Sequence, residues 1–193
     1  MPYNPAIHNR KRLRLKDYDY SKPNLFFVTI CCQDRRHLFG HVENGVMILN
    51  DAGKMVKKWY LELENKYPDK KCHEMVVMPN HVHFILENGP PVGSTTQGRP
   101  HGGDFYGIEI TQSKYGMHNK KYKSNLFDAI GWFKTMTTNE YIRGVKQSNW
   151  QRFNKRVWQR SYFERIVRSD LAYFFISRYI RNNPMNWTRD RMK

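Results

Sequence analysis

The chain has 193 residues, of which 39% are hydrophobic and 15% aromatic, and this excludes intrinsic disorder as its overall state. Its 33 Lys and Arg residues outnumber its 17 Asp and Glu residues and give a formal net charge of +16. The basic residues form short clusters along the whole chain, whereas a membrane-surface peptide would concentrate them on one helix. We therefore expect a single globular domain over residues 1–193 that binds a polyanion, and the spread of the basic residues favours nucleic acid.

The cysteines and the N-terminal segment bear on the cellular compartment. Cys31, Cys32 and Cys72 are odd in number and include an adjacent pair, so they do not form a disulfide framework. Residues 1–22 are polar and basic, without a secretory signal or a long apolar run. We expect a cytoplasmic protein with no membrane partner. The segment is interpreted as a basic arm, or equally as a solvated tail, and its candidate phosphate contacts are Arg10, Lys11, Arg12 and Arg14.

The first half of the chain alternates strand and helix patterns. Apolar, β-branched and aromatic residues predict strands at residues 25–32, 73–78 and 81–87, and a short extended segment at 46–49. Residues 34–45 are expected to be a polar loop. Apolar residues at helical spacing predict a helix over residues 52–67, capped by Asn50 or Asp51 and ended by Pro68. Pro79 and Asn80 predict a turn, so the last two strands form a hairpin.

The second half begins with a Gly- and Pro-rich insertion at residues 88–124. A connection of this length is usually functional, and a small strand is expected inside it at residues 105–111. His101 and His118 are poor ligand candidates there, because loops position a metal less well than strands and helices. The remaining elements are helices at 126–145 and 170–182, the second capped by Ser169 and stopped by Pro184, with a fourth strand at 157–167 between them.

The order strand, helix, strand, strand, helix, strand is that of the ferredoxin-like fold. The sequence therefore predicts the α+β class, with an antiparallel sheet that carries helices on one face. The helix at 170–182 is additional to this pattern. We expect it to lie across the free face of the sheet.

Two histidines on the third predicted strand are candidate metal ligands. Alternate residues of a strand point to opposite faces, so His81, His83 and Ile85 are expected to share one face and the apolar residues between them the other. Two neutral imidazoles placed in this way can hold a divalent metal ion. Two polar surface histidines are the plainer interpretation, and the chain has neither a His-Glu-x-x-His nor a Cys-x-x-Cys motif.

Tyr179 and Asn183 are four residues apart and therefore neighbours on one face of the last helix. The first offers a phenolic oxygen and the second a neutral oxygen ligand. Each also has a structural interpretation, as a core tyrosine and as a helix stop. Pro184 disfavours helical geometry at Asn183.

The segment His81-Val82-His83 resembles the His-hydrophobic-His motif of the HUH single-tyrosine transposases. The ending Tyr179-Ile180-x-x-Asn183-Pro184 resembles that of the REP-associated tyrosine transposases, and so do residues 18–21 leading into 27–31, and residues 157–164. These matches run in order over most of the chain and leave out the insertion at 88–124. The resemblance rests on the ordered set of motifs and not on any one of them.

The resemblance implies a ferredoxin-like enzyme that nicks and rejoins single-stranded DNA beside a hairpin of a repetitive extragenic element. It implies that His81 and His83 bind Mg²⁺ or Mn²⁺, that Asn183 lies near the third ligand position, and that Tyr179 attacks to give a covalent 5′-phosphotyrosine. Tyr173 is the alternative nucleophile. Asn183 is shorter than the usual Gln or Glu and, unlike Glu or Asp, carries no charge, so we expect weak metal binding or help from Glu164.

Further residues are assigned supporting roles. Gln159 and Glu164 are interpreted as polar residues of the site, or equally as ordinary strand polarity. Trp158 and Tyr162 are interpreted as core residues rather than as stacking platforms for bases. The expected partner is single-stranded or hairpin DNA, and the expected oligomeric state is a monomer or a homodimer. The candidate contacts to the DNA backbone in this region are Lys155, Arg156 and Arg160.

Three other functions compete with strand transfer. A protein of the same fold could hold hairpin DNA without cleaving it, and a metal nuclease would use water in place of a tyrosine. A two-histidine phosphoesterase requires two His-x-Ser/Thr motifs, and this chain has none. A covalent DNA–protein adduct separates strand transfer from the first two.

Overall fold

The structure, a computed structural model, describes residues 15, 17–89, 120–121, 123–190 and 192. The predicted strand at 105–111, His101, His118 and the four basic residues of the N-terminal arm lie outside these ranges. The boundaries of the arm and of the insertion therefore stay predictions. Within these ranges every helix is too short or too polar to serve as a membrane span. All three cysteines are free thiols, as predicted.

The centre of the molecule is a four-stranded sheet with the order β4-β5-β1-β6. Its strands are β1 (Asn24–Cys31), β4 (Lys70–Met78), β5 (His81–Asn88) and β6 (Phe163–Val167). Each neighbouring pair is antiparallel. Helix α1 (Asp51–Lys66) follows β1 in the chain, and α2 (Leu126–Gln147) lies between β5 and β6. This is the ferredoxin-like order, and the predicted α+β class is confirmed.

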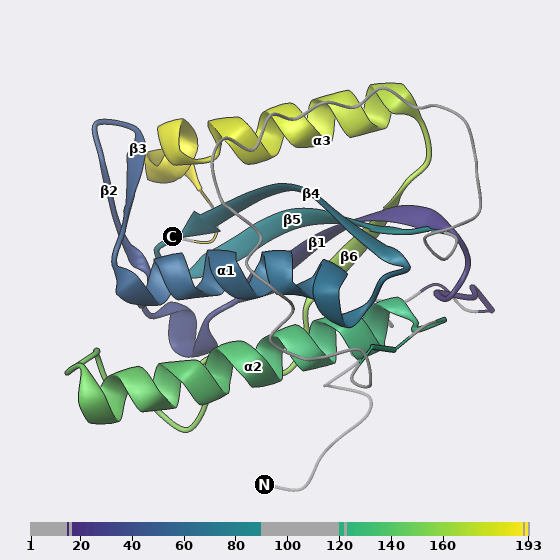
Figure 1. Ribbon diagram of the computed structural model, residues 1–193. Coiled ribbons are helices and arrows are strands. Elements are labelled where there is room, and N and C mark those ends of the chain that lie inside the picture. The colour runs from purple at the N-terminus through teal and green to yellow at the C-terminus, as the bar shows by residue number, and fades with distance from the viewer. Residues whose placement is uncertain (1–14, 16, 90–119, 122, 191, 193) are drawn as a thin grey trace, which may run out of the picture.

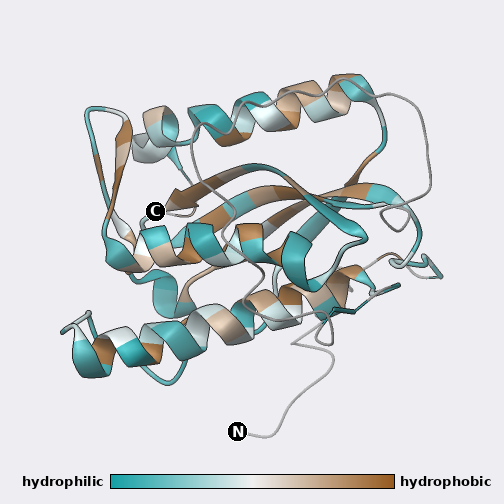
Figure 2. Cartoon of the chain, in the orientation of Figure 1, coloured by the Kyte–Doolittle hydropathy of each residue, from teal (hydrophilic) through white to brown (hydrophobic). Residues whose placement is uncertain are grey.

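Helices cover both faces of the sheet. In Figure 1, α1 and α2 lie on one side, and α3 (Asp170–Asn182) crosses the other, as predicted for the additional helix. The larger core fills the α1/α2 side and includes Val82, Phe84 and Leu86 of β5, while Ile85 packs into a smaller cluster under α3. Figure 2 shows the strands as mostly hydrophobic and the helices as alternately hydrophobic and hydrophilic. The predicted alternation of β5 is therefore confirmed.

Side-chain caps fix the starts of the helices. Asn50 Oδ1 accepts from the Gly53 amide at 2.9 Å, and Ser169 Oγ accepts from the Ala172 amide at 3.1 Å, both at predicted caps. Asn125 caps α2 in the same way. Each cap satisfies a backbone donor that has no partner within its own helix.

The fourth predicted strand, at residues 157–167, is wrong in extent. The fourth strand covers only Phe163–Val167, because the upstream apolar residues pack in the core and not in the sheet. Trp158 forms one isolated bridge with Cys32, and its indole Nε1 donates to Thr137 Oγ1 at 2.9 Å. Trp158 is 3% exposed, so its interpretation as a core residue is confirmed.

The predicted loop at 34–45 contains a strand, β2 (Gly40–Glu43), paired with β3 (Val46–Leu49) in a separate two-stranded sheet. Asn44 and Gly45 connect them with φ of 50° and 76°. Positive φ at both positions is the pattern of a type I′ hairpin turn, for which Asn-Gly is the preferred pair. The hairpin was therefore present in the sequence as a local signal.

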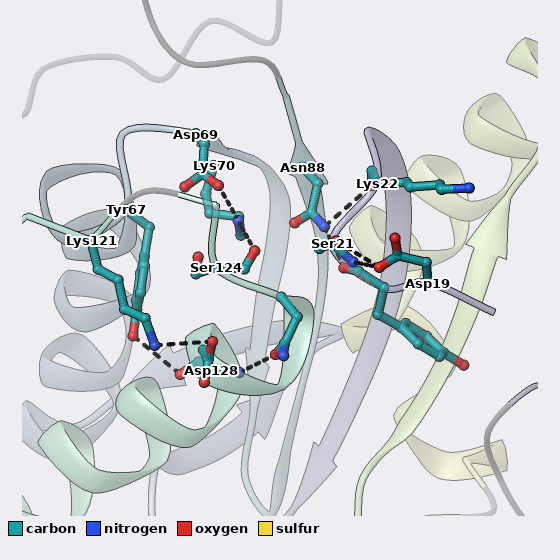
Figure 3. Close-up of polar contacts among 12 residues, drawn as sticks. Asp19, Ser21, Lys22, Tyr67, Asp69, Lys70, Asn88, Lys121, Ser124 and Asp128 are labelled. Carbon is teal, nitrogen blue, oxygen red and sulfur yellow. Dashed lines mark hydrogen bonds and ion pairs between the residues drawn. The ribbon is translucent and has the colours of Figure 1, made fainter. Parts of the chain in front are cut away.

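Strand β4 begins at Lys70, three residues before the predicted start. The two lysines at its start interrupt the apolar pattern from which the strand was predicted. The Lys70 ammonium is buried, and its Nζ lies 2.9 Å from Asp69 Oδ2 and donates to the Ser124 carbonyl at 2.7 Å. Figure 3 shows these contacts beside the Asp128 carboxylate, which Lys121 reaches at 3.1 Å. The hydrogen bond from Lys70 to Ser124 thus connects the start of β4 with the segment that leads into α2.

Candidate functional site

Strand β5 places two imidazoles side by side on the face beneath α3. His81 and His83 are 0% and 1% exposed, and their ring centroids are 4.6 Å apart. The Nδ1 atom of each ring has a partner: Asn80 Oδ1 lies 2.7 Å from that of His81, and Thr29 Oγ1 lies 2.7 Å from that of His83. Thr29 is opposite His83 in the β1–β5 register. Both Nε2 atoms remain for another group.

Both histidines are neutral near pH 7. Burial lowers the pKa of His81 to about 4, against an opposing contribution from Asp190, and burial lowers the pKa of His83 well below its usual value. Each ring therefore has one protonated nitrogen and one lone pair. In the tautomer that directs Nδ1–H to its neighbouring oxygen, the lone pair lies on Nε2.

Helix α3 brings Tyr179 to this pair. Its phenolic oxygen lies 3.2 Å from His83 Nε2, and its ring contacts that of Phe27 at a centroid distance of 6.0 Å. The side chain is 46% exposed, so the hydroxyl lies at the boundary between the buried imidazoles and solvent. Burial, and then the charge of Asp190, raise the pKa of Tyr179. The phenol is therefore protonated at neutral pH and donates to Nε2.

Asn183 lies one turn beyond Tyr179. Its backbone is helical, with φ −58° and ψ −42°, so the predicted disfavouring by Pro184 does not hold at this position. The reason is that Pro184 occupies the first position of a further turn, η3 (Pro184–Arg189), where proline fits. The Asn183 side chain is 3% exposed. It lies close enough to lower the pKa of Tyr179 and to raise that of His81, yet its Oδ1 has no hydrogen-bond partner.

Asp190 completes this group, and sequence reasoning missed it. The η3 turn brings the chain back over β5, so that Asp190 Oδ2 lies 3.6 Å from His81 Nε2 with the side chain 9% exposed. The Trp187 ring, 8% exposed, lies over His81 at a centroid distance of 6.1 Å. No motif spacing links Asp190 to the histidines, because an irregular turn sets its position.

The donor atoms fit a divalent ion with nitrogen and oxygen ligands. His81 Nε2, Asn183 Oδ1 and Asp190 Oδ2 are buried and have no hydrogen-bond partner in the described part of the chain. Buried polar atoms normally have hydrogen-bond or metal partners, so three unpartnered atoms in one site indicate that a bound group would pair with them. In the described ranges, no three His, Cys, Asp or Glu side chains already lie close enough together to hold a metal ion by themselves. The candidate donor set is mixed, because it includes the amide oxygen of Asn183 as well as imidazole and carboxylate atoms.

Comparisons with known proteins agree with this fold. No family model matches the chain. An uncharacterized protein of Haemophilus influenzae is 33% identical over 195 residues, which cover 98% of this chain and 96% of that protein. The chain belongs to the family of this protein.

Among solved structures, a REP-associated tyrosine transposase bound to a REP hairpin superimposes with a TM-score of 0.55 at 17% identity, over 90% of this chain and 74% of the other. The fold is transposase-like.

The structure gives Glu164 and Tyr173 partners other than the histidine pair. Glu164 is opposite Val28 of β1, whose side chain belongs to the α1/α2 core, and its Oε1 accepts from Tyr20 at 3.3 Å. The backbone N–H of Gln159 donates to the carbonyl of Cys31, the last residue of β1, which is opposite His81 in the register. Tyr173 donates to Glu74 Oε2 at 2.7 Å.

The predicted DNA contacts beyond the arm gather at one place. Lys155, Arg156 and Arg160 are exposed and line a cleft beside α2, together with Lys134. Lys134 Nζ donates to the carbonyls of Gln159 and Arg160. These hydrogen bonds hold the Lys134 side chain against the backbone of that segment. The basic lining of the cleft suits a phosphate backbone.

Proposed function

We propose that this protein is a metal-dependent enzyme that nicks and rejoins single-stranded DNA through a covalent 5′-phosphotyrosine at Tyr179. The observation that carries the proposal is a contact between a half-exposed phenol and a buried pair of neutral imidazoles. Tyr179 Oη lies 3.2 Å from His83 Nε2. The transposase-like fold and the net charge of +16 support it.

The site residues have distinct roles in this proposal. His81, His83 and Asn183 hold Mg²⁺ or Mn²⁺, which, when bound, neutralises and orients the anionic phosphodiester. The Tyr179 oxygen forms a bond to phosphorus while the bond from phosphorus to the 3′-oxygen breaks. The phenol loses one proton and the leaving 3′-oxygen gains one. Because the phosphotyrosine replaces one phosphodiester by another, a second 3′-hydroxyl can reverse the step without ATP.

An aromatic surface beside Tyr179 supports a single-stranded partner. Phe163 of β6 is 47% exposed, and its ring lies 6.4 Å from that of Phe27, which also contacts His83 and Tyr179. Arg165 is exposed and opposite Phe27 in the register, and so lies on the same face. Unpaired bases stack on exposed aromatic rings while basic side chains contact phosphates. We infer that the strand runs along β6 past Tyr179.

One chain assembles the whole arrangement, because α3 places Tyr179 against His83 of its own β5. The proposed reaction therefore needs no second copy to supply the tyrosine. A monomer is sufficient.

Hairpin binding without cleavage is the second candidate. It is favoured by the burial of both imidazoles beneath α3 and Trp187, because among Tyr179, His81, His83 and Asn183 the tyrosine is the one exposed side chain. Hairpin DNA with a single-stranded flank, incubated with Mn²⁺ and run on a denaturing gel, distinguishes the two. With a 3′ label, a 5′-phosphotyrosine gives a labelled protein band; with a 5′ label, it gives a shorter free fragment. Binding with neither product supports the second candidate.

A further inference from the structure

We propose that Asp190 is a ligand of the divalent ion held by His81, His83 and Asn183, and that it supplies the negative charge which the sequence motif lacks. This inference rests on the metal site of the proposed function. It is carried by the geometry of two acceptor atoms that face each other, His81 Nε2 and Asp190 Oδ2, 3.6 Å apart.

The hydrogen bonds around His81 fix which of its nitrogens carries the lone pair. Asn80 Nδ2 donates to the Met192 carbonyl at 2.7 Å, and this contact sets the orientation of the amide. Asn80 Oδ1 then faces His81 Nδ1 at 2.7 Å and can only accept, so the proton of the neutral ring is on Nδ1. The lone pair on Nε2 points toward the carboxylate.

Two lone pairs facing each other in a buried place are unfavourable unless a cation lies between them. Neither Nε2 nor Oδ2 has a hydrogen-bond partner in the part of the chain that the structure describes. The Asp190 side chain is 9% exposed, and a buried carboxylate is stabilised by pairing or by metal coordination. A divalent cation would satisfy both atoms, and Asn183 Oδ1 beside them.

The Asp190 carboxylate is also held as metal-ligating carboxylates usually are. Its Oδ1 accepts from the Met192 amide at 2.8 Å, which orients Oδ2 toward the histidine. His81 Nε2 and Asp190 Oδ2, 3.6 Å apart, are near enough that both would be ligands of one small divalent ion. Mg²⁺ and Mn²⁺ both prefer oxygen ligands of this kind.

The test compares Mn²⁺ binding, by titration calorimetry on the full chain, among four proteins: wild type, Asp190→Asn, His81→Ala and Asp51→Asn. Asp51 is a matched control because its side chain is 75% exposed on α1. The Asn side chain keeps the shape of Asp190 and can donate to His81 Nε2. We therefore expect Asp190→Asn to bind Mn²⁺ at least about 10-fold more weakly, while its melting temperature in EDTA is equal to or above that of wild type.

The outcomes separate this inference from the proposed function. Weak binding by both Asp190→Asn and His81→Ala, with Asp51→Asn unchanged, supports it. Wild-type binding by Asp190→Asn with weak binding by His81→Ala overturns the role of Asp190 and leaves the metal site standing. Wild-type binding by both variants overturns the metal site itself. A lower melting temperature of Asp190→Asn in EDTA with unchanged Mn²⁺ affinity shows a structural ion pair instead.

A second variant covers the case in which Asp190→Asn does not fold. A thiolate at a ligand position favours soft ions, so Asp190→Cys is expected to raise the affinity for Cd²⁺ relative to Mn²⁺. An unchanged ratio of the two affinities overturns the inference.

Discussion

The phenolic oxygen of Tyr179 lies 3.2 Å from His83 Nε2, although the two residues are 96 positions apart in the chain. The lone pair of Nε2 can accept the phenolic proton or bind a metal ion, but it cannot do both. In the proposed enzyme, occupation of the metal site therefore releases the tyrosine from its hydrogen bond. The proposed nucleophile and the proposed metal site are thus linked through one nitrogen atom, His83 Nε2.

This linkage predicts that Tyr179→Phe binds Mn²⁺ more tightly than wild type. Removal of the phenol frees Nε2 of a hydrogen bond worth about 0.5–1.5 kcal/mol, which corresponds to about 2- to 10-fold in affinity. Calorimetric titration of the two proteins gives the ratio. Tyr173→Phe is the control, because that hydroxyl contacts Glu74 and His73 instead. Weaker binding by Tyr179→Phe would show that the phenolic oxygen is itself a ligand.

The exposed ring of Phe163 is predicted to contribute to single-strand affinity. Phe163→Ala should weaken binding of the single-stranded flank by about 1–3 kcal/mol, the usual contribution of one base–aromatic stack. Fluorescence anisotropy in EDTA measures this without cleavage. Phe174→Ala is a matched control, since Phe174 is 52% exposed on α3 and contacts the ring of Phe175. Equal losses in both variants would argue against a stacking platform on β6.

The burial of His81 predicts a loss of stability in mild acid. Its pKa is about 4 in the folded protein and 6.5 as a free side chain, so between these values the unfolded chain binds the additional proton. The free energy of unfolding then falls as the pH falls from 6.5 to 4, by about 3 kcal/mol from this residue alone. Urea titrations at several pH values measure the slope. A slope in His81→Gln equal to that of wild type would contradict this account, and His41→Gln, at an exposed position, serves as control.

Two glycines of α2 predict opposite effects on stability. A Cβ at Gly144 would lie 2.2 Å from Cδ2 of Trp150, so Gly144→Ala should destabilise by about 1–3 kcal/mol through overpacking. A Cβ at Gly131 would meet no atom within 4 Å, so Gly131→Ala should stabilise by up to about 1 kcal/mol through helix propensity. Thermal or urea unfolding of both variants tests the packing of α2. A stable Gly144→Ala protein would mean that Trp150 does not pack there.

Local patterns were sufficient for the elements that carry the site. The alternation of β5 predicted that His81 and His83 share a face, and the helical spacing of Tyr179 and Asn183 predicted their shared side of α3. Both signals depend on periodicity within one element. Such periodicity is visible in the sequence because each element has one buried face.

Contacts between elements could not be predicted in the same way. Glu164 points into the α1/α2 core because it is opposite Val28 in the β1–β6 register, and a shift of one residue would have placed it on the face of the sheet that carries the histidines. Asp190 reaches His81 only because η3 reverses the chain after α3. Neither the register nor the path of a short turn is encoded in a local repeat.

The central claim is that Tyr179 becomes covalently joined to DNA. The most direct measurement is a denaturing gel of 3′-labelled hairpin DNA with a single-stranded flank, incubated with Mn²⁺ and wild type, Tyr179→Phe, Tyr173→Phe or His81→Ala. The account predicts a labelled protein band for wild type and Tyr173→Phe, and none for Tyr179→Phe or His81→Ala. Cleavage of the DNA by wild type without any labelled protein band, or a band that persists in Tyr179→Phe, would contradict it.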